Sequence, residues 1–238
     1  DIMRHENGEW MLQGTEASDP SRIRDPEGLI AYVEQAGFLP LFQNEIPGFS
    51  VEEHTLAADW WTGDPERDPW EWRSIAARSH RLAYGKFFSG KAGFLSLEWL
   101  PLFVNHRRDG YDFDSLYEAG KAGHRERQIM ELFTEGASLF SWQIRQLLDT
   151  GKSPEGALTR LQMQLYLVTE DFQQRLSKQG VPYGMSAARY CTPEKLWGYE
   201  AVTAAYGESP ADSYDRIRQQ ILKRYPDASD RAIRRICP

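Results

Sequence analysis

The chain has 238 residues, a net charge of −7 and 41% hydrophobic residues, which suits one large globular domain or two small ones. It lacks the ~20 consecutive apolar residues of a transmembrane helix, and its first residues, DIMRHENGEWMLQG, lack the apolar core of a signal peptide, so we expect a cytoplasmic protein with no membrane partner. Its two cysteines, Cys191 and Cys237, are too few for a disulfide framework or a zinc site.

The charge is distributed unevenly along the chain. Residues 1–70 carry 4 basic and 15 acidic side chains, whereas residues 71–108 carry 7 basic and 2 acidic ones. Nucleic-acid-binding proteins usually show a basic face, because counterion release from phosphates supplies most of the non-specific affinity. Residues 71–108 are therefore the segment that suits phosphate, although the same charges also suit solvated helix faces.

Two helices and a hairpin are predicted in the first half of the chain. Asp25 caps a helix whose apolar residues share one face until Gly37 ends it. Asp68 caps a second helix that we expect to extend to about Tyr84. Two short aromatic and apolar runs around a glycine-bearing turn then predict a β-hairpin over residues 84–96.

The tip of this hairpin, GKFFSGKAG at residues 85–93, partly matches the phosphate-binding pattern G-x-x-x-x-G-K. Ala92 replaces the Ser or Thr hydroxyl that Mg²⁺ needs, and Phe87 and Phe88 fill a stretch that would have to wrap around an anion. The preceding segment also lacks the buried β-strand of such proteins. We interpret these residues as a hairpin with a basic tip, not as a nucleotide-binding loop.

Three helical segments follow in the second half: RERQIMELFTEG, SLFSWQIRQLLDT and ALTRLQMQLYLVTED. A two-stranded ribbon over residues 172–191 comes after them. Three helices and a hairpin form the winged-helix arrangement, a helix-turn-helix variant whose third helix can enter the DNA major groove. The predicted fold class is therefore mainly α with short β-hairpins, in a tandem winged-helix architecture.

These elements divide the chain into four predicted parts. Residues 1–20 form a polar, loosely held N-terminal segment, and residues 21–120 a winged-helix-like region. A winged-helix domain at 121–191 and closing helices at 192–238 complete the chain.

Three segments resemble the AlkZ-related proteins: RIRDPEGLIAYVEQAGFLPLF, DPWEWRSIAARSHRLAYGKFFSGKAGFLSLEW and LTRLQMQLYLVTEDF. The resemblance extends over nearly the whole chain. This group is named for its distant similarity to the bacterial DNA glycosylase AlkZ, which removes alkylated or crosslinked bases. To the glycosylases themselves the resemblance is partial, covering a helical tandem winged-helix layout and the segment after the first helix.

In the glycosylases that segment bears Gln-x-Gln or Gln-x-Asp, whose side chains position the attacking water. Here Pro40 and Phe42 occupy the two catalytic places, and neither can hold a water, so the resemblance implies a non-catalytic relative with a nucleic-acid-binding or DNA-repair-associated role. Gln43 and Glu45 would restore Gln-x-acid after a shift of three residues, which makes them weak catalytic candidates. Glu45, Glu52 and Glu53 near His54 are interpreted as solvated surface.

Two groups of side chains are candidate nucleic-acid contacts. From the basic segment they are Lys86, Lys91, His106, Arg107 and Arg108, and from the third helix of the second half they are Arg160, Gln162 and Gln164. The same helix also suits a purely structural role. Binding to DNA would be weak and salt-sensitive, because few phosphates are neutralised.

Four tryptophans lie close together at Trp60, Trp61, Trp70 and Trp72. They predict either packing within the body or, with Arg73, an aromatic platform or pocket. The alternative function is therefore a small-molecule-binding protein or enzyme with a tryptophan-walled pocket. The histidines have no metal-binding spacing and no nucleophile elbow is present, so neither a metal nor a cofactor is expected.

Overall fold

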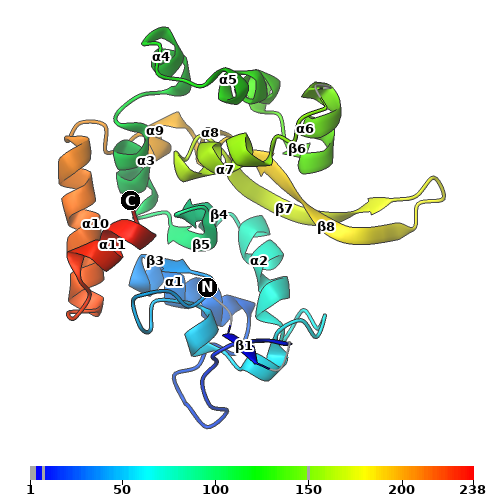
Figure 1. Cartoon of the computed structure of the whole chain (residues 1–238), viewed down its shortest axis with the longest axis vertical. Helices are drawn as coiled ribbons and strands as arrows, with labels where there is room; N and C mark the ends of the chain where they lie inside the picture. Colours follow the sequence, from blue (N-terminus) through cyan, green and yellow to red (C-terminus); the bar gives the residue numbers. More distant parts are fainter. Residues whose placement is uncertain (1–3, 7–8, 149–150) are drawn as a thin grey trace.

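A computed structural model of the chain describes residues 4–6, 9–148 and 151–238 (Figure 1). Two three-stranded antiparallel sheets organise it, in the orders β3–β5–β4 and β6–β8–β7. Their strands are β3 (Phe38–Pro40), β4 (Leu82–Phe88), β5 (Lys91–Ser96), β6 (Leu139–Phe140), β7 (Val168–Leu176) and β8 (Pro182–Cys191). A separate ribbon pairs β1 (Arg4–Glu6) with β2 (Glu9–Met11).

The first sheet packs against α1 (Pro26–Ala36), α2 (Pro69–Arg78) and α3 (Leu100–Arg108). As predicted, the Asp25 carboxylate caps α1 by accepting the N–H of Gly28 at 2.6 Å. Gly37 ends the helix with φ +97°, and a Cβ atom there would lie 2.7 Å from the Trp99 indole. The turn at Gly37 therefore directs β3 into the sheet, where Phe38 pairs with Leu95.

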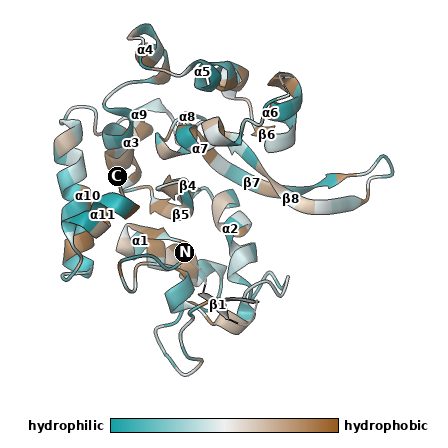
Figure 2. Ribbon diagram, viewed as in Figure 1, coloured by the Kyte–Doolittle hydropathy of each residue, from teal (hydrophilic) through white to brown (hydrophobic). Residues whose placement is uncertain are grey.

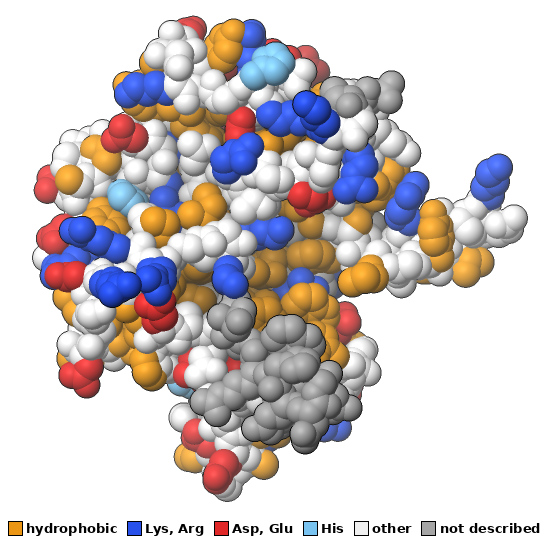
Figure 3. Space-filling view, in the orientation of Figure 1, with side chains coloured by type: hydrophobic (Ala, Val, Ile, Leu, Met, Phe, Trp, Pro, Cys, Tyr) orange, Lys and Arg blue, Asp and Glu red, His pale blue; other side chains and the backbone are white. Residues whose placement is uncertain are grey.

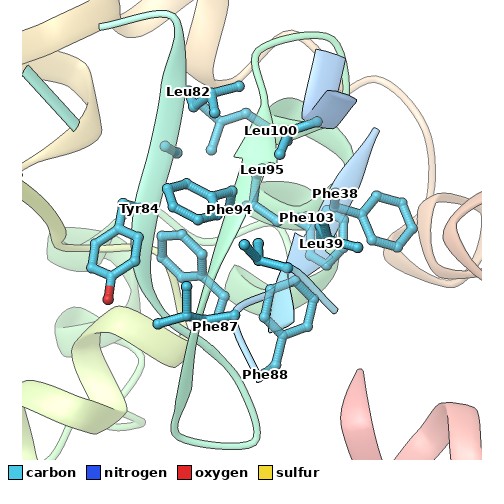
Figure 4. Packing of buried hydrophobic residues seen from close by; sticks show 14 of the residues in the cluster. Phe38, Leu39, Leu82, Tyr84, Phe87, Phe88, Phe94, Leu95, Leu100 and Phe103 are labelled. Carbon is cyan, nitrogen blue, oxygen red and sulfur yellow. The ribbon is translucent and has the colours of Figure 1, made fainter. Parts of the chain in front are cut away.

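Aromatic rings pack against aliphatic side chains in the core of this half (Figure 4). Phe38 meets Phe103 edge to face with ring centroids 4.9 Å apart, and Phe87 and Phe94 are fully buried nearby. Figure 2 shows β4 and β5 among the most hydrophobic parts of the chain. The closing helices contribute Ile217, Ile221 and Ile233 to this same core. They are α8 (Pro193–Trp197), α9 (Tyr199–Val202), α10 (Pro210–Arg224) and α11 (Asp230–Ile236).

The second sheet has its own core, formed with four helices. They are α4 (Phe113–Glu118), α5 (His124–Met130), α6 (Ser141–Leu148) and α7 (Glu155–Met163). Short 3₁₀ turns lie at Glu52–His54, Ala57–Asp59 and Glu131–Gly136. In Figure 1, β7 and β8 extend as a long ribbon beyond the rest of the molecule.

The predicted fold class is wrong. The chain is about 46% helical and 16% strand, a mixed α/β fold rather than a mainly α one with short hairpins. Hairpins do form at both expected places, but β3 and β6 each add a third strand. β3 and β6 are strands because they pair with β5 and β8, which lie far away in the sequence. Pairing of this kind leaves little signal in the residues of the strand itself.

Three predicted helices also end early. The one expected over 125–136 stops at Met130, and a 3₁₀ segment follows it. The helix from Asp68 stops at Arg78, and the following residues enter β4. The helix expected over 157–171 stops at Met163, because Leu165 adopts φ +59° and the chain from Val168 onwards pairs with β8. Residues 149 and 150, at the end of the helix predicted over 138–150, lie outside the described residues, as do parts of the N-terminal segment 1–20.

Candidate functional site

A cavity of about 490 Å³ opens where the end of β3, the β4–β5 turn and α11 meet. We call it the β3 cavity. Residues from all three places form its wall, among them Pro40, Phe42, Glu45, Lys91, Arg235 and Ile236. The structure therefore brings together the glycosylase-like segment and the basic hairpin tip, two features that lie about fifty residues apart in the sequence.

The sheet holds Pro40 at the inner end of this cavity. Its carbonyl accepts the N–H of Val51 at 2.9 Å, and the next N–H, of Leu41, donates to Ala92 at 3.0 Å. Gly93 lies opposite Pro40, and a Cβ atom at Gly93 would approach the Leu39 carbonyl oxygen to 2.8 Å. The Pro40 carbonyl is thus already hydrogen-bonded within the protein, and proline adds no polar side chain.

Phe42, which the resemblance aligns with the second catalytic position of the glycosylases, lies between the cavity and the tryptophans. Its ring centroid lies 5.4 Å from that of Trp60 and 6.2 Å from that of Trp70. The phenyl ring presents an apolar surface to the cavity. Neither Pro40 nor Phe42 offers an atom that could orient a water for attack on a sugar.

The weak catalytic candidates Gln43 and Glu45 are held by different partners. The Gln43 amide donates to Gln13 Oε1 at 2.8 Å, and its backbone N–H donates to Glu52 at 3.2 Å. The Glu45 carboxylate forms an ion pair with Arg235 at 2.5 Å. Both residues line the cavity, but these contacts aim them at separate partners.

Contrary to the expectation of a solvated surface, Glu52 is fully buried, and its carboxylate contacts the chain that lines the cavity. Its carboxylate accepts the backbone N–H groups of Gln13 at 2.7 Å and Gln43 at 3.2 Å. Burial raises the pKa of Glu52, and the two N–H donors partly oppose that shift. The side chain thus fixes the chain on which Gln43 lies, a role for which the sequence gives no local signal.

The rim of the cavity is basic. The side chain of Lys91 is exposed and forms no hydrogen bond or ion pair with any residue that the structure describes. The side chain of Arg235 is also exposed, at 58%, and forms an ion pair with Glu45. Figure 3 shows hydrophobic side chains at the middle of this face with Lys and Arg side chains around them. Such an arrangement suits an anionic ligand that also has an apolar surface.

The other cations of the basic segment turn inwards. Arg107 donates to the Met163 carbonyl at 2.8 Å, and burial lowers the pKa of its guanidinium. Arg108 is 2% exposed and donates to the Leu165 carbonyl at 2.7 Å and to Glu194 at 2.5 Å. His106 hydrogen-bonds the Pro238 carbonyl, and burial lowers its pKa. These three side chains join α3 to later parts of the chain.

The nucleic-acid contacts predicted on α7 also differ in their exposure to solvent. Gln162 is buried, where its amide oxygen accepts the Lys86 backbone N–H and its amide N–H donates to Leu158, both at 3.1 Å. Gln164 follows the last residue of the helix. Arg160 is 61% exposed and pairs with Glu126. Of the three, Arg160 is the side chain that faces solvent.

The tryptophans mostly build the core. Trp60 and Trp72 are buried, whereas Trp61 is exposed. The Arg73 guanidinium lies between the rings of Trp70, at 3.3 Å, and Phe172, at 4.5 Å. No tryptophan lines the β3 cavity. The cluster supports Phe42 from behind and links α2 to β7.

Two further properties concern the described part of the chain as a whole. No three His, Cys, Asp or Glu side chains within residues 4–6, 9–148 and 151–238 come together as a metal site. None of the helices in those residues has the length and apolarity that a membrane span requires.

The fold and the site define a mixed α/β protein with two three-stranded sheets and a basic-rimmed cavity beside the first one. Residues 23–238 match the family described as AlkZ related, and the chain belongs to that family. Neither a curated protein nor a solved structure matches the chain significantly.

Proposed function

We propose that this AlkZ-related protein binds nucleic acid on the face around the β3 cavity and does not excise bases. The observation that carries the proposal is the wall of the cavity itself. Where the glycosylase-like segment passes, Pro40 and Phe42 present apolar atoms, while Lys91 and Arg235 supply charge at the rim. Binding is thus supported by the same surface that lacks the groups for hydrolysis.

The charges support weak, salt-sensitive binding. Lys91 is available to a phosphate directly, and Arg235 becomes available by leaving Glu45, because an exposed ion pair contributes only about 0–1 kcal/mol. Arg160 of α7 adds a third cation, because its side chain is 61% exposed although it pairs with the buried Glu126. Each phosphate contact lowers log affinity by ~0.9 per unit of log salt on duplex DNA. The low number of free cations therefore predicts a shallow salt dependence.

A titration of a fluorescent duplex at two salt concentrations tests this proposal. Raising salt from about 50 to about 200 mM is expected to weaken binding by roughly tenfold if two phosphates are neutralised. The double variant Lys91→Ala/Arg235→Ala is expected to lose most of the affinity and to reduce the salt slope by about two. Binding unchanged in that variant would contradict the proposed face.

The chain offers a matched control. Arg216 is 57% exposed and pairs with Glu208, much as Arg235 is 58% exposed and pairs with Glu45. Lys223 is an exposed lysine on the same helix as Arg216. The variant Lys223→Ala/Arg216→Ala removes the same charge as the test variant and is expected to retain binding.

Absence of catalysis is tested separately. Duplexes with alkylated or crosslinked bases are incubated with the protein, and abasic sites are measured. We expect no release above the protein-free control, because Pro40 and Phe42 cannot position a water. Release that disappears in Glu45→Gln would instead assign catalysis to the shifted Gln43 and Glu45.

A further inference from the structure

The ribbon formed by β7 and β8 leaves the body of the molecule and carries unusually exposed apolar side chains. We call residues 168–191 the wing. From residue 178 to residue 186 every residue is exposed. The large apolar side chains of this outer part, with their exposures, are Leu176 (63%), Val181 (59%), Tyr183 (48%) and Met185 (89%). Single exposed apolar residues are ordinary, but four at the end of one hairpin indicate a contact surface.

The base of the wing is firmly attached. β8 pairs with β6, where Arg189 lies opposite Phe140. Trp142 lies parallel to Phe140, with ring centroids 6.0 Å apart, and the Arg175 guanidinium lies 4.5 Å from the centre of the Trp142 ring. These contacts hold the first part of the ribbon, so its outer end projects in a defined direction (Figure 1).

The pairing of the two strands is irregular at the outer end of the wing, and Met185 lies next to this irregularity. The register of the two strands shifts between Gln173 and Arg175. At that level the Gln174 amide donates to the Gly184 carbonyl at 2.6 Å, and Gly184 has φ +72°. The next residue, Met185, is the most exposed of the large apolar side chains.

The charge of the wing favours an anionic partner. Beyond its base, over residues 172–191, the wing carries Arg175, Lys178 and Arg189 and no acidic residue. Its two acidic residues, Glu170 and Asp171, lie at the base, where Glu170 pairs with Arg189 and Lys195 and Asp171 pairs with Arg78. In Figure 3, Lys and Arg side chains continue from the middle of the face onto the projecting wing.

We infer that the wing inserts its apolar side chains at unpaired or unstacked bases of nucleic acid, while Arg175 and Lys178 contact the flanking phosphates. This inference rests on the proposed function and names the form of nucleic acid that the protein prefers. Leu and Met are among the side chains that proteins insert between base steps. Unstacking costs a few kcal/mol per step and least where pairing is already lost. The wing thus favours a duplex with unpaired bases over a fully paired one.

Fluorescence anisotropy with two related DNA molecules tests the inference. One is a fully paired duplex, and the other has the same length and a short central mismatched bubble with 2-aminopurine. We expect the wild-type protein to bind the bubble roughly tenfold more tightly, the effect of about one well-stacked base. The emission of 2-aminopurine is expected to change on binding, which attraction by charge alone would not produce.

Three variants separate the contributions. Leu176→Ser/Met185→Ser is expected to bind the bubble and the duplex equally and to leave 2-aminopurine unchanged, while its duplex affinity stays within about twofold of wild type. Arg175→Ala/Lys178→Ala is expected to weaken both complexes and reduce the salt slope. Leu147→Ser is the matched control, because Leu147 is an exposed leucine of α6 (58%) outside the wing, and it is expected to keep the preference.

The outcomes are distinct. Equal binding of both DNA molecules by the wild type, with duplex binding still dependent on Lys91 and Arg235, would overturn the role of the wing and leave the proposed function standing. No binding to either DNA would overturn both. Binding to anionic lipid vesicles that is lost in Leu176→Ser/Met185→Ser, without any preference for the bubble, would assign the wing to a membrane surface instead.

Discussion

Single side chains decide what the β3 cavity can do. Pro40 and Phe42 contribute apolar atoms to its wall, while Lys91 and Arg235 place two cations at the rim beside the Glu45 carboxylate. Glu52 then holds the intervening chain in place from inside. A buried carboxylate costs free energy unless it is hydrogen-bonded, so its two backbone donors are needed to retain it.

The buried Glu52 makes stability depend on pH. Because burial raises its pKa above the ordinary value of 4.5, the folded state binds this proton more tightly than the unfolded chain. Its contribution to the free energy of unfolding is therefore fully present below the unfolded pKa and declines as pH rises through the folded pKa. We expect the advantage of wild type over Glu52→Gln to shrink as pH rises above 4.5. Urea unfolding across this range measures it, and a difference that is constant with pH would contradict the assignment.

Helix α1 and strand β3 meet at a turn that places the whole glycosylase-like segment. Gly37 has φ +97°, a conformation that favours glycine, and a Cβ atom there would lie 2.7 Å from the Trp99 indole. From there β3 pairs with β5 and delivers Pro40 and Phe42 to the cavity. The position of the cavity wall thus depends on a residue that does not line it.

Replacing Gly37 with Ala is expected to destabilise the protein by about 2–4 kcal/mol, because the new Cβ meets both an unfavourable φ and the Trp99 ring at 2.7 Å. Gly63→Ala is the control. Gly63 has φ +80° with nothing within 4 Å, so only the backbone cost of about 1 kcal/mol applies. Thermal unfolding followed by circular dichroism compares them. Equal losses of stability in the two variants would show that the Trp99 side chain moves aside at no cost in free energy.

At the scale of the whole molecule, two arginines tie distant segments together. Arg108 contacts the Leu165 carbonyl, Glu194 and the Tyr206 hydroxyl, and so joins α3 to the start of the second sheet and to α8. Arg78 pairs with the buried Asp171 at 2.9 Å and links α2 to β7. These contacts join the elements around the first sheet to those of the second sheet.

Arg108→Ala is expected to cost about 2–4 kcal/mol, because it leaves Glu194 and the Leu165 carbonyl without their partner. Arg81→Ala, which breaks exposed pairs with Glu27 and Glu34, is expected to cost less than about 1 kcal/mol. Denaturant midpoints measure both. A loss of nucleic-acid binding by Arg108→Ala with unchanged stability would return Arg108 to the binding surface.

The sequence by itself determined the features that depend on neighbouring residues. The Asp25 cap, the stop at Gly37 and the turns of both hairpins follow from local backbone preferences, and the membership in the AlkZ-related family follows from residue order. Only the tertiary structure decided that Arg107, Arg108 and Gln162 point inwards, that Glu52 is buried, and that Lys91 meets Glu45 and Arg235 at one cavity. The physical reason is that burial and strand pairing depend on segments far apart in the chain, and the local pattern around a charged or amide side chain is the same whether another segment covers it or leaves it in water.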